Sequence, residues 1–91
     1  MDDNQMRIIA YEEGGMWVAQ CLEHDISAQA DTISKVKKRL LATIAAEAKD
    51  GLDRIGPAPE HFQSMWNDAS GTYQPSAPHA FPDDYEMKLC A

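Results

Sequence analysis

The stretch from residue 14 to residue 34, GGMWVAQCLEHDISAQADTIS, decides the fold of this 91-residue chain. It opens with Gly14 and Gly15, which separate two apolar runs, MRIIAYE at 6–12 and MWVAQCL at 16–22. A Gly-Gly pair between two such runs is typical of a tight β-hairpin turn. The sequence therefore predicts two antiparallel strands joined by these glycines.

A third strand is predicted directly after the hairpin. Residues 26–31 alternate between apolar Ile or Ala and polar side chains, a period typical of a strand with one buried face. His24 and Asp25 would then form the turn that precedes it. Successive strand side chains point to opposite faces. In the second strand, Trp17, Ala19 and Cys21 share one face, and Met16, Val18, Gln20 and Leu22 share the other. Both faces are largely apolar, so both need cover.

The segment TISKVKKRLLATIAAEAKDGL at 32–52 predicts one long amphipathic helix. Its apolar stripe consists of Ile33, Val36, Leu40, Ile44 and Ala48, widened by Leu41 and Leu52. Thr32 or Asp31 is the expected N-cap, and Gly51 lies where the helix should end. One helix can cover only one sheet face. We therefore expect the opposite face to drive self-association into a dimer or tetramer.

Residues 55–91 read as an extension of the core formed by 1–54. GPAP at 56–59 is a linker, and the apolar spacing that follows predicts a short helix at about 58–69. Residues 70–84 contain three prolines without periodicity and predict an irregular strap, whereas YEMKLC at 85–90 alternates like a strand. The predicted fold is α+β: a two-layer βββαβ arrangement, with one long helix across an antiparallel sheet of three to four strands. The terminal strand would complete that sheet.

The charge distribution narrows the function classes. The net charge of -7 argues against general nucleic-acid binding, because such binding depends on neutralising phosphates with Lys and Arg. A basic protein partner fits better. The bases are concentrated in residues 32–54, between two acidic segments. No apolar run is long enough to span a membrane, and MDDNQM at 1–6 carries two acids where a secretory signal carries positive charge, so we expect a cytoplasmic protein.

Cys21 and His24 have a metal-like spacing, and three further side chains could complete a site: His61, His79 and Cys90. Structural zinc sites usually show two paired ligand motifs, and this chain has half of one, so we expect no metal and no cofactor. A Cys21–His24 nucleophile pair is disfavoured because strand residues three apart point to opposite faces. If the terminal strand pairs with the first strand, Cys90 lies on the order of 10 Å from Cys21, which excludes a disulfide.

Two clusters of charged residues have both a structural and a functional interpretation. Glu12, Glu13, Glu23 and Asp25 suggest a magnesium-dependent nuclease, but acids at hairpin ends are usually solvated turn residues. The basic residues Lys35, Lys38 and Arg39 could contact RNA phosphates, although such a run is more often a solvated helix face. We expect no enzymatic activity from either cluster.

Taken together, these elements resemble the HicB-like antitoxin domain. The resemblance lies in RIIAYEEGG, MWVAQCLEHDI, SAQADT and ISKVKKRLLATI, and covers residues 7 to about 50. It implies a ββαβ or βββαβ domain with the post-helix strand beside the first strand. It also implies a partner, because family members of toxin–antitoxin pairs block a small basic mRNA-cleaving toxin of the HicA type. Opposite charge would speed and orient such docking.

The chain departs from the family pattern at three places. CLEHDIS lacks the proline and glycine of the usual loop after the second strand, and Ser34 and Lys35 stand where acids are common in the first helical turn. Residues 55–91 show neither a ribbon-helix-helix nor a helix-turn-helix pattern, which argues against DNA binding by this chain.

Two hypotheses follow from the sequence. The first is a HicB-like, non-enzymatic protein that acts by protein–protein contact, neutralising a toxin through Glu12, Glu13, Glu23 and Asp25 or assembling with itself. The second is a stand-alone self-assembling or small RNA-binding domain that uses Lys35, Lys38 and Arg39.

Overall fold

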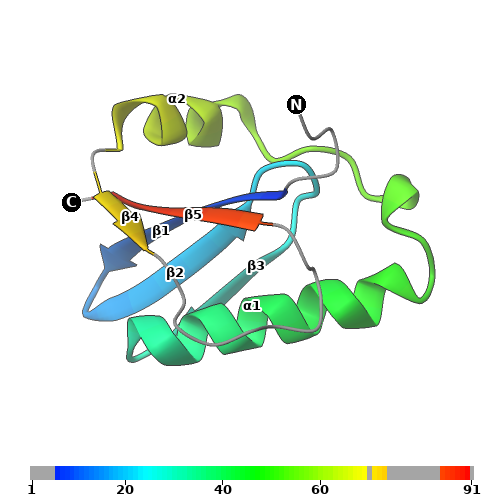
Figure 1. Cartoon of the computed structure of the whole chain (residues 1–91), viewed down its shortest axis with the longest axis horizontal. Helices are drawn as coiled ribbons and strands as arrows, with labels where there is room; N and C mark the ends of the chain where they lie inside the picture. The colour runs from blue at the N-terminus through cyan, green and yellow to red at the C-terminus, as the bar shows by residue number, and fades with distance from the viewer. Residues whose placement is uncertain (1–5, 70, 74–84, 91) are drawn as a thin grey trace.

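The computed structural model describes residues 6–69, 71–73 and 85–90 and contains one mixed sheet between two helices (Figure 1). The elements are β1 (Met6–Glu13), β2 (Met16–Cys21), β3 (Ser27–Ala30), α1 (Ile33–Ala48), the 3-10 turn η1 (Leu52–Arg54), α2 (Glu60–Asp68), β4 (Gly71–Tyr73) and β5 (Tyr85–Cys90). The strand order is β3-β2-β1-β5-β4. The predicted α+β class, the long helix, the short second helix and the terminal strand beside β1 are confirmed.

The β1–β2 hairpin has the predicted two-glycine turn. Glu13 pairs with Met16, so only Gly14 and Gly15 lie between the paired residues. Their φ angles are 61° and 82°, in the left-handed region that glycine enters without a steric penalty. Hairpin turns with positive φ at both central residues match the twist of the flanking strands. The glycine pair therefore fixes the register of β1 against β2.

Helix α1 begins at Ile33 and is capped by Thr32, whose side-chain hydroxyl accepts a hydrogen bond from the Lys35 backbone N–H at 3.1 Å. No acid occupies its first turn, as the sequence indicated. Val36, Leu40 and Ile44 are fully buried against the sheet, which confirms the predicted stripe. The residues that α1 covers form the first core: Met6, Ile8, Ala10, Ala19, Cys21, Ile26, Ala30 and Met87.

Strand β5 is parallel to β1, with Met6 opposite Tyr85 and Tyr11 opposite Cys90. The sheet is therefore mixed, whereas we had expected antiparallel pairing throughout. The physical reason is the long, helix-containing connection between the two strands, which lets the chain return to the starting end of β1 before it enters the sheet. Strand β4 is antiparallel to β5 at 71–73, within the segment predicted to be irregular; residues 74–84 of that segment lie outside the described residues.

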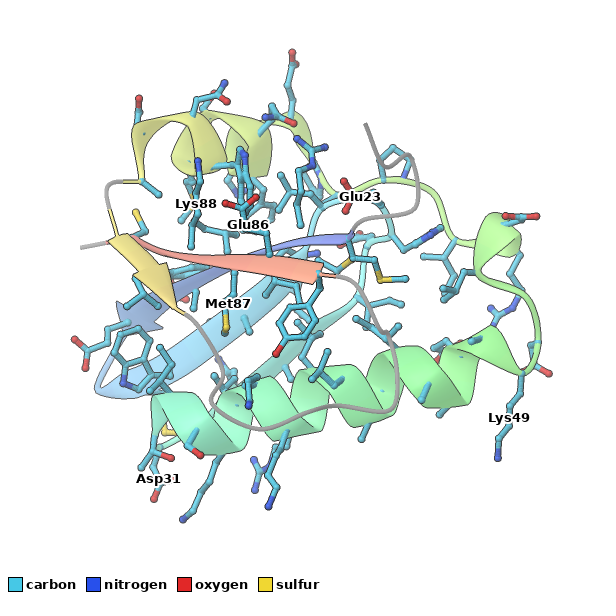
Figure 2. The ribbon with its side chains drawn as sticks, in the orientation of Figure 1. Glu23, Asp31, Lys49, Glu86, Met87 and Lys88 are labelled. Carbon is cyan, nitrogen blue, oxygen red and sulfur yellow. The ribbon has the colours of Figure 1, made fainter. Side chains whose placement is uncertain are left out.

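Helix α2 covers the second face of the sheet. Trp66 is buried there with Ile9 and Leu22, and four partly buried residues pack around them: Phe62, Met65, Ala69 and Cys90. Figure 1 shows α1 and α2 on opposite sides of the sheet. In Figure 2, Met87 points from β5 toward α1, whereas Glu86 and Lys88 point to the side of α2. The extension thus covers its own sheet and adds a layer to the two that were predicted.

Candidate functional site

The Cys21 and His24 side chains have different surroundings in the structure. Cys21 belongs to the first core and has no solvent exposure. Burial raises the pKa of its thiol, and nearby backbone N–H groups offset that effect only in part. A buried thiol with a raised pKa is a poor nucleophile and a poor metal ligand. The His24 ring instead places Nδ1 at 2.9 Å from the Ile55 carbonyl oxygen, where it links the β2–β3 loop to the chain after α1.

Cys90 lies far from Cys21 in the fold. Both cysteines are free. Cys21 packs in the first core under α1, whereas Cys90 packs with the α2 cluster on the other face. Strand β1 also lies between their two strands. Within residues 6–69, 71–73 and 85–90, no group of three His, Cys, Asp or Glu side chains is placed to hold a metal ion; His79 lies outside these ranges.

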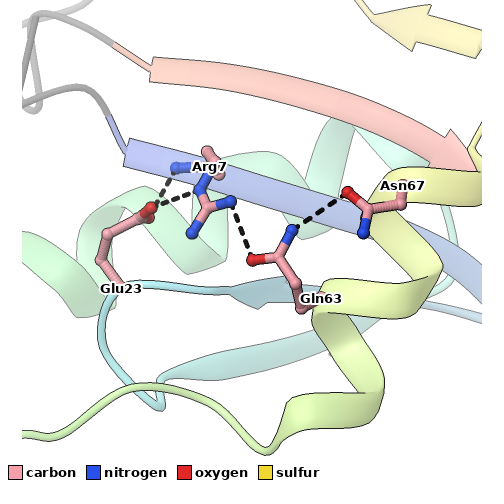
Figure 3. Close-up of polar contacts among 4 residues, drawn as sticks. All are labelled: Arg7, Glu23, Gln63 and Asn67. Atoms are coloured by element: carbon pink, nitrogen blue, oxygen red, sulfur yellow. Dashed lines mark hydrogen bonds and ion pairs between the residues drawn. The ribbon is translucent and has the colours of Figure 1, made fainter.

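Glu23, which we had considered a partner contact, is bound within the molecule by Arg7 (Figure 3). Its Oε1 accepts the Arg7 backbone N–H at 2.8 Å, and its Oε2 accepts Arg7 Nε at 2.5 Å. Arg7 also donates to Gln63 Oε1 at 2.9 Å, and Gln63 donates to Asn67 at 3.2 Å. These contacts join β1, the β2–β3 loop and α2. Glu23 therefore has a structural role in positioning α2.

Asp25 is exposed at the same loop and also organises the chain locally. Its Oδ1 accepts a hydrogen bond from Gln20 at 3.0 Å, and its backbone N–H donates to the Gly56 carbonyl at 2.8 Å. The Ala58 N–H donates to the Leu22 carbonyl at 3.0 Å. The β2–β3 loop thus holds the segment that carries the chain from the α1 side of the sheet to α2.

Glu12 and Glu13 lie at the other end of β2, beside the Gly14-Gly15 turn. Both are exposed, and neither forms an ion pair with a described residue. The length of a strand such as β2 separates them from Glu23 by roughly 20 Å. The four acids that the sequence singled out therefore form two separate groups, of which only the hairpin pair lacks an internal partner for its carboxylates.

The basic residues of α1 lie on its exposed side near β3. Lys35 Nζ is 3.2 Å from Asp31, and Arg39 donates to the Gln29 carbonyl at 2.7 Å. Lys38 is exposed and has no ion-pair partner among the described residues. The structure thus brings the three predicted nucleic-acid residues onto one helix, with two of them engaged locally.

The two helices carry opposite charge on opposite faces of the sheet. Residues 33–48 contain four bases and one acid, Glu47, which pairs with Arg54. Residues 60–68 contain Glu60 and Asp68 and no Lys or Arg. Among the described helices, none is both long and apolar enough to cross a membrane.

Sequence reasoning did not anticipate Arg7 and Gln63 as organising residues. The available signal was Arg7 itself, the one base among seven acids in residues 1–31. The apolar spacing that predicted the second helix includes Trp66, but it gave no sign of the cations beside this ring. Arg7 and Lys88 both lie over its ring, at 5.8 and 4.5 Å from the centroid. Such cation–π contacts combine residues from three elements that no local pattern connects.

Comparison with known proteins assigns no family: no family model, no curated protein and no solved structure matches this chain.

Proposed function

We propose that this chain is a HicB-like, antitoxin-type protein that acts by binding a small basic protein, an mRNA-cleaving toxin of the HicA type. The contact would be made by the hairpin end that carries Glu12 and Glu13. The observation that carries the proposal is the pair of exposed carboxylates there, neither of them in an ion pair with a described residue. Opposite charge on a partner would accelerate and orient its docking at this end.

The arrangement of the chain also supports the proposal. The resemblance implies three strands, a helix and a strand that returns beside the first, and β5 occupies that position next to β1. Cys21 is buried with a raised pKa, so the proposal assigns it no catalytic role. Glu23 and Asp25 serve the fold, and the proposed contact therefore rests on Glu12 and Glu13 alone.

The RNA-binding alternative has weaker support. Lys35 is paired with Asp31 and Arg39 donates to the Gln29 carbonyl, so two of the three bases are partly engaged within the chain. Nucleic-acid affinity depends on the number of phosphates neutralised, and the acidic chain opposes a polyanion. Binding of the wild-type chain to RNA at low salt would support this alternative over the protein contact.

Self-association stays a prediction. The prediction rested on an apolar sheet face that the first helix leaves uncovered. In the structure, α2 covers Ile9 and Leu22 on that face. Sedimentation at micromolar concentration distinguishes a monomer from the expected dimer or tetramer. The antitoxin proposal does not depend on the result.

Affinity capture from the native host tests the proposed function. Three tagged proteins are compared: wild type, the double variant Glu12→Lys/Glu13→Lys, and the control Asp53→Lys/Glu60→Lys. The control makes the same charge change at two exposed acids away from the hairpin. We expect wild type and control to retain one small basic protein near stoichiometry, and the hairpin variant to lose it. The captured protein should cleave RNA and be inhibited by wild type.

Capture of the bait alone, or equal capture by all three proteins, would contradict the proposal.

A further inference from the structure

Strand β3 forms one edge of the sheet, and its register shows which of its backbone groups face outward. Cys21 N–H donates to the Ile26 carbonyl at 2.9 Å, and Ala19 lies opposite Ala28. In an antiparallel ladder, hydrogen-bonded pairs alternate with pairs whose backbone groups point away from each other. Ser27 and Gln29 belong to the second kind. Their N–H and C=O groups therefore point away from β2, toward the open edge.

Among the described residues, a side chain covers only one of these groups. Arg39, which lies on the neighbouring helix α1, donates a hydrogen bond to the Gln29 carbonyl at 2.7 Å. Both Ser27 groups and the Gln29 N–H have no hydrogen-bond partner among the described residues, and both residues are exposed. An exposed row of such groups is a template for pairing with another strand. Arg39 therefore blocks one of the backbone groups with which an added strand would pair.

The positive charges beside this edge favour the binding of an acidic segment. Lys35, Lys38 and Arg39 are all exposed on α1, which packs directly against β3. Alternate side chains of a strand are roughly 7 Å apart, and helix residues four apart rise about 6 Å. Acidic side chains at alternate positions of an added strand would therefore match Lys35 and Arg39 in spacing. Asp31 is paired with Lys35 in an exposed ion pair, which a carboxylate of the added strand could join or replace.

We propose that the β3 edge is a docking surface for an extended, acidic segment of a partner protein, which adds to the sheet beside β3. A backbone N–H of the segment replaces Arg39 at the Gln29 carbonyl, and the released guanidinium pairs with a carboxylate of the segment. This recognition mode combines main-chain hydrogen bonds with side-chain selectivity. The surface is formed by β3 and α1, two strands across the sheet from Glu12, and it uses neither hairpin acid, so the inference does not rest on the proposed function.

Binding is measured by fluorescence anisotropy with short labelled peptides. The first alternates Thr and Glu, the second alternates Thr and Lys, and the third is the acidic peptide with a central proline that removes a backbone donor. We expect the acidic peptide to bind, and the other two to bind at least about tenfold more weakly. Equal binding of the acidic and basic peptides, or no binding of the acidic peptide at millimolar concentration, overturns the proposal.

Ser27→Pro tests the backbone part of the contact. The Ser27 N–H points outward, so proline removes no ladder bond to β2, and proline is tolerated where an edge N–H faces solvent. We expect Ser27→Pro to weaken binding of the acidic peptide about tenfold and Ser27→Ala to leave it unchanged. Unweakened binding by a folded Ser27→Pro protein contradicts the proposal.

Lys38→Glu tests the charge part and does not disturb the strand. Lys49→Glu is the matched control, because it reverses one exposed lysine at the far end of the same helix. We expect Lys38→Glu to weaken binding of the acidic peptide about tenfold, and Lys49→Glu to weaken it by less than about twofold. Equal losses in the two variants would show general charge attraction and overturn the proposal. So would tighter binding of single-stranded RNA than of the acidic peptide.

Discussion

Arg7 holds both carboxylate oxygens of Glu23, one through its backbone N–H at 2.8 Å and one through Nε at 2.5 Å. The same guanidinium donates to Gln63 on α2. These partners are separated from Arg7 by 16 and 56 residues. A single side chain on β1 thus connects the β2–β3 loop to the helix that covers the second sheet face.

We expect the Arg7–Glu23 pair to contribute modestly to stability. The side chains are 35% and 29% exposed, so solvent screens much of their attraction. A double-mutant cycle with Arg7→Met and Glu23→Gln should give a coupling free energy of about 1 kcal/mol from urea unfolding. Glu60→Gln, at an exposed acid, serves as the control. A coupling indistinguishable from zero would show that the contact only orients the chain.

Trp66 should be the most important single residue of α2. It is 8% exposed and packs on Ile9 and Leu22. Trp66→Ala should lower the free energy of unfolding by about 3 kcal/mol or more, because it removes a large buried side chain. It should also promote self-association in sedimentation experiments, since apolar sheet surface becomes exposed.

The matched control for Trp66 is Ser64→Ala on the exposed side of α2. It should change stability by less than about 0.5 kcal/mol. If both variants keep wild-type stability, α2 does not pack on the sheet in solution.

Thr32 is expected to stabilise the start of α1 through its hydrogen bond to the Lys35 N–H. Thr32→Ala removes the acceptor and should cost about 1 kcal/mol in chemical denaturation. Thr32→Ser keeps a hydroxyl and should retain most of the stability. Equal stability of the alanine and serine variants would mean that another group satisfies this N–H.

Cys21 should make stability fall at alkaline pH. Burial raises the pKa of its thiol in the folded state above the ordinary value of 9.0. As the pH rises through that value, the unfolded chain loses this proton first, so the free energy of unfolding decreases. The stabilisation is fully present below pH 9 and is lost toward the higher folded pKa.

Urea unfolding at a series of pH values from neutral to alkaline measures this effect in wild type and Cys21→Ala. The variant should lose less stability per pH unit near and above the thiol pKa. Some slope should remain, because burial and the charge of Glu13 also raise the pKa of Tyr11. Identical slopes in the two proteins would mean that Cys21 ionises as easily in the folded state as in the unfolded chain.

Several features were predictable because their causes lie within a few neighbouring residues. The Gly14-Gly15 pair determines a tight turn, since both positions need a positive φ. The spacing of Val36, Leu40 and Ile44 determines which side of α1 faces the sheet. The alternation in residues 85–90 likewise identified β5. The hairpin acids Glu12 and Glu13 were also placed correctly at a turn.

Other features depended on where distant segments meet. The parallel direction of β5 follows from the path of the chain through α1 and α2, which the alternation of residues 85–90 does not encode. The apolar stripe of α2 also did not determine that this helix covers its own sheet, because the same stripe could pack on a second molecule. The contacts of Gly56 and Ala58 with the β2–β3 loop direct α2 to its own sheet.

The roles of the charged residues were the least predictable from the sequence. Glu23 and Glu12 are both acids near strand ends, yet Glu23 meets Arg7 and Glu12 meets no described base. Arg39 lay in a basic run but reaches the edge of β3. Local sequence determined the elements of this protein, because backbone conformation and apolar periodicity act over a few residues. Only the tertiary structure decided which charges are used internally and which stay exposed, because that depends on contacts between residues far apart in the chain.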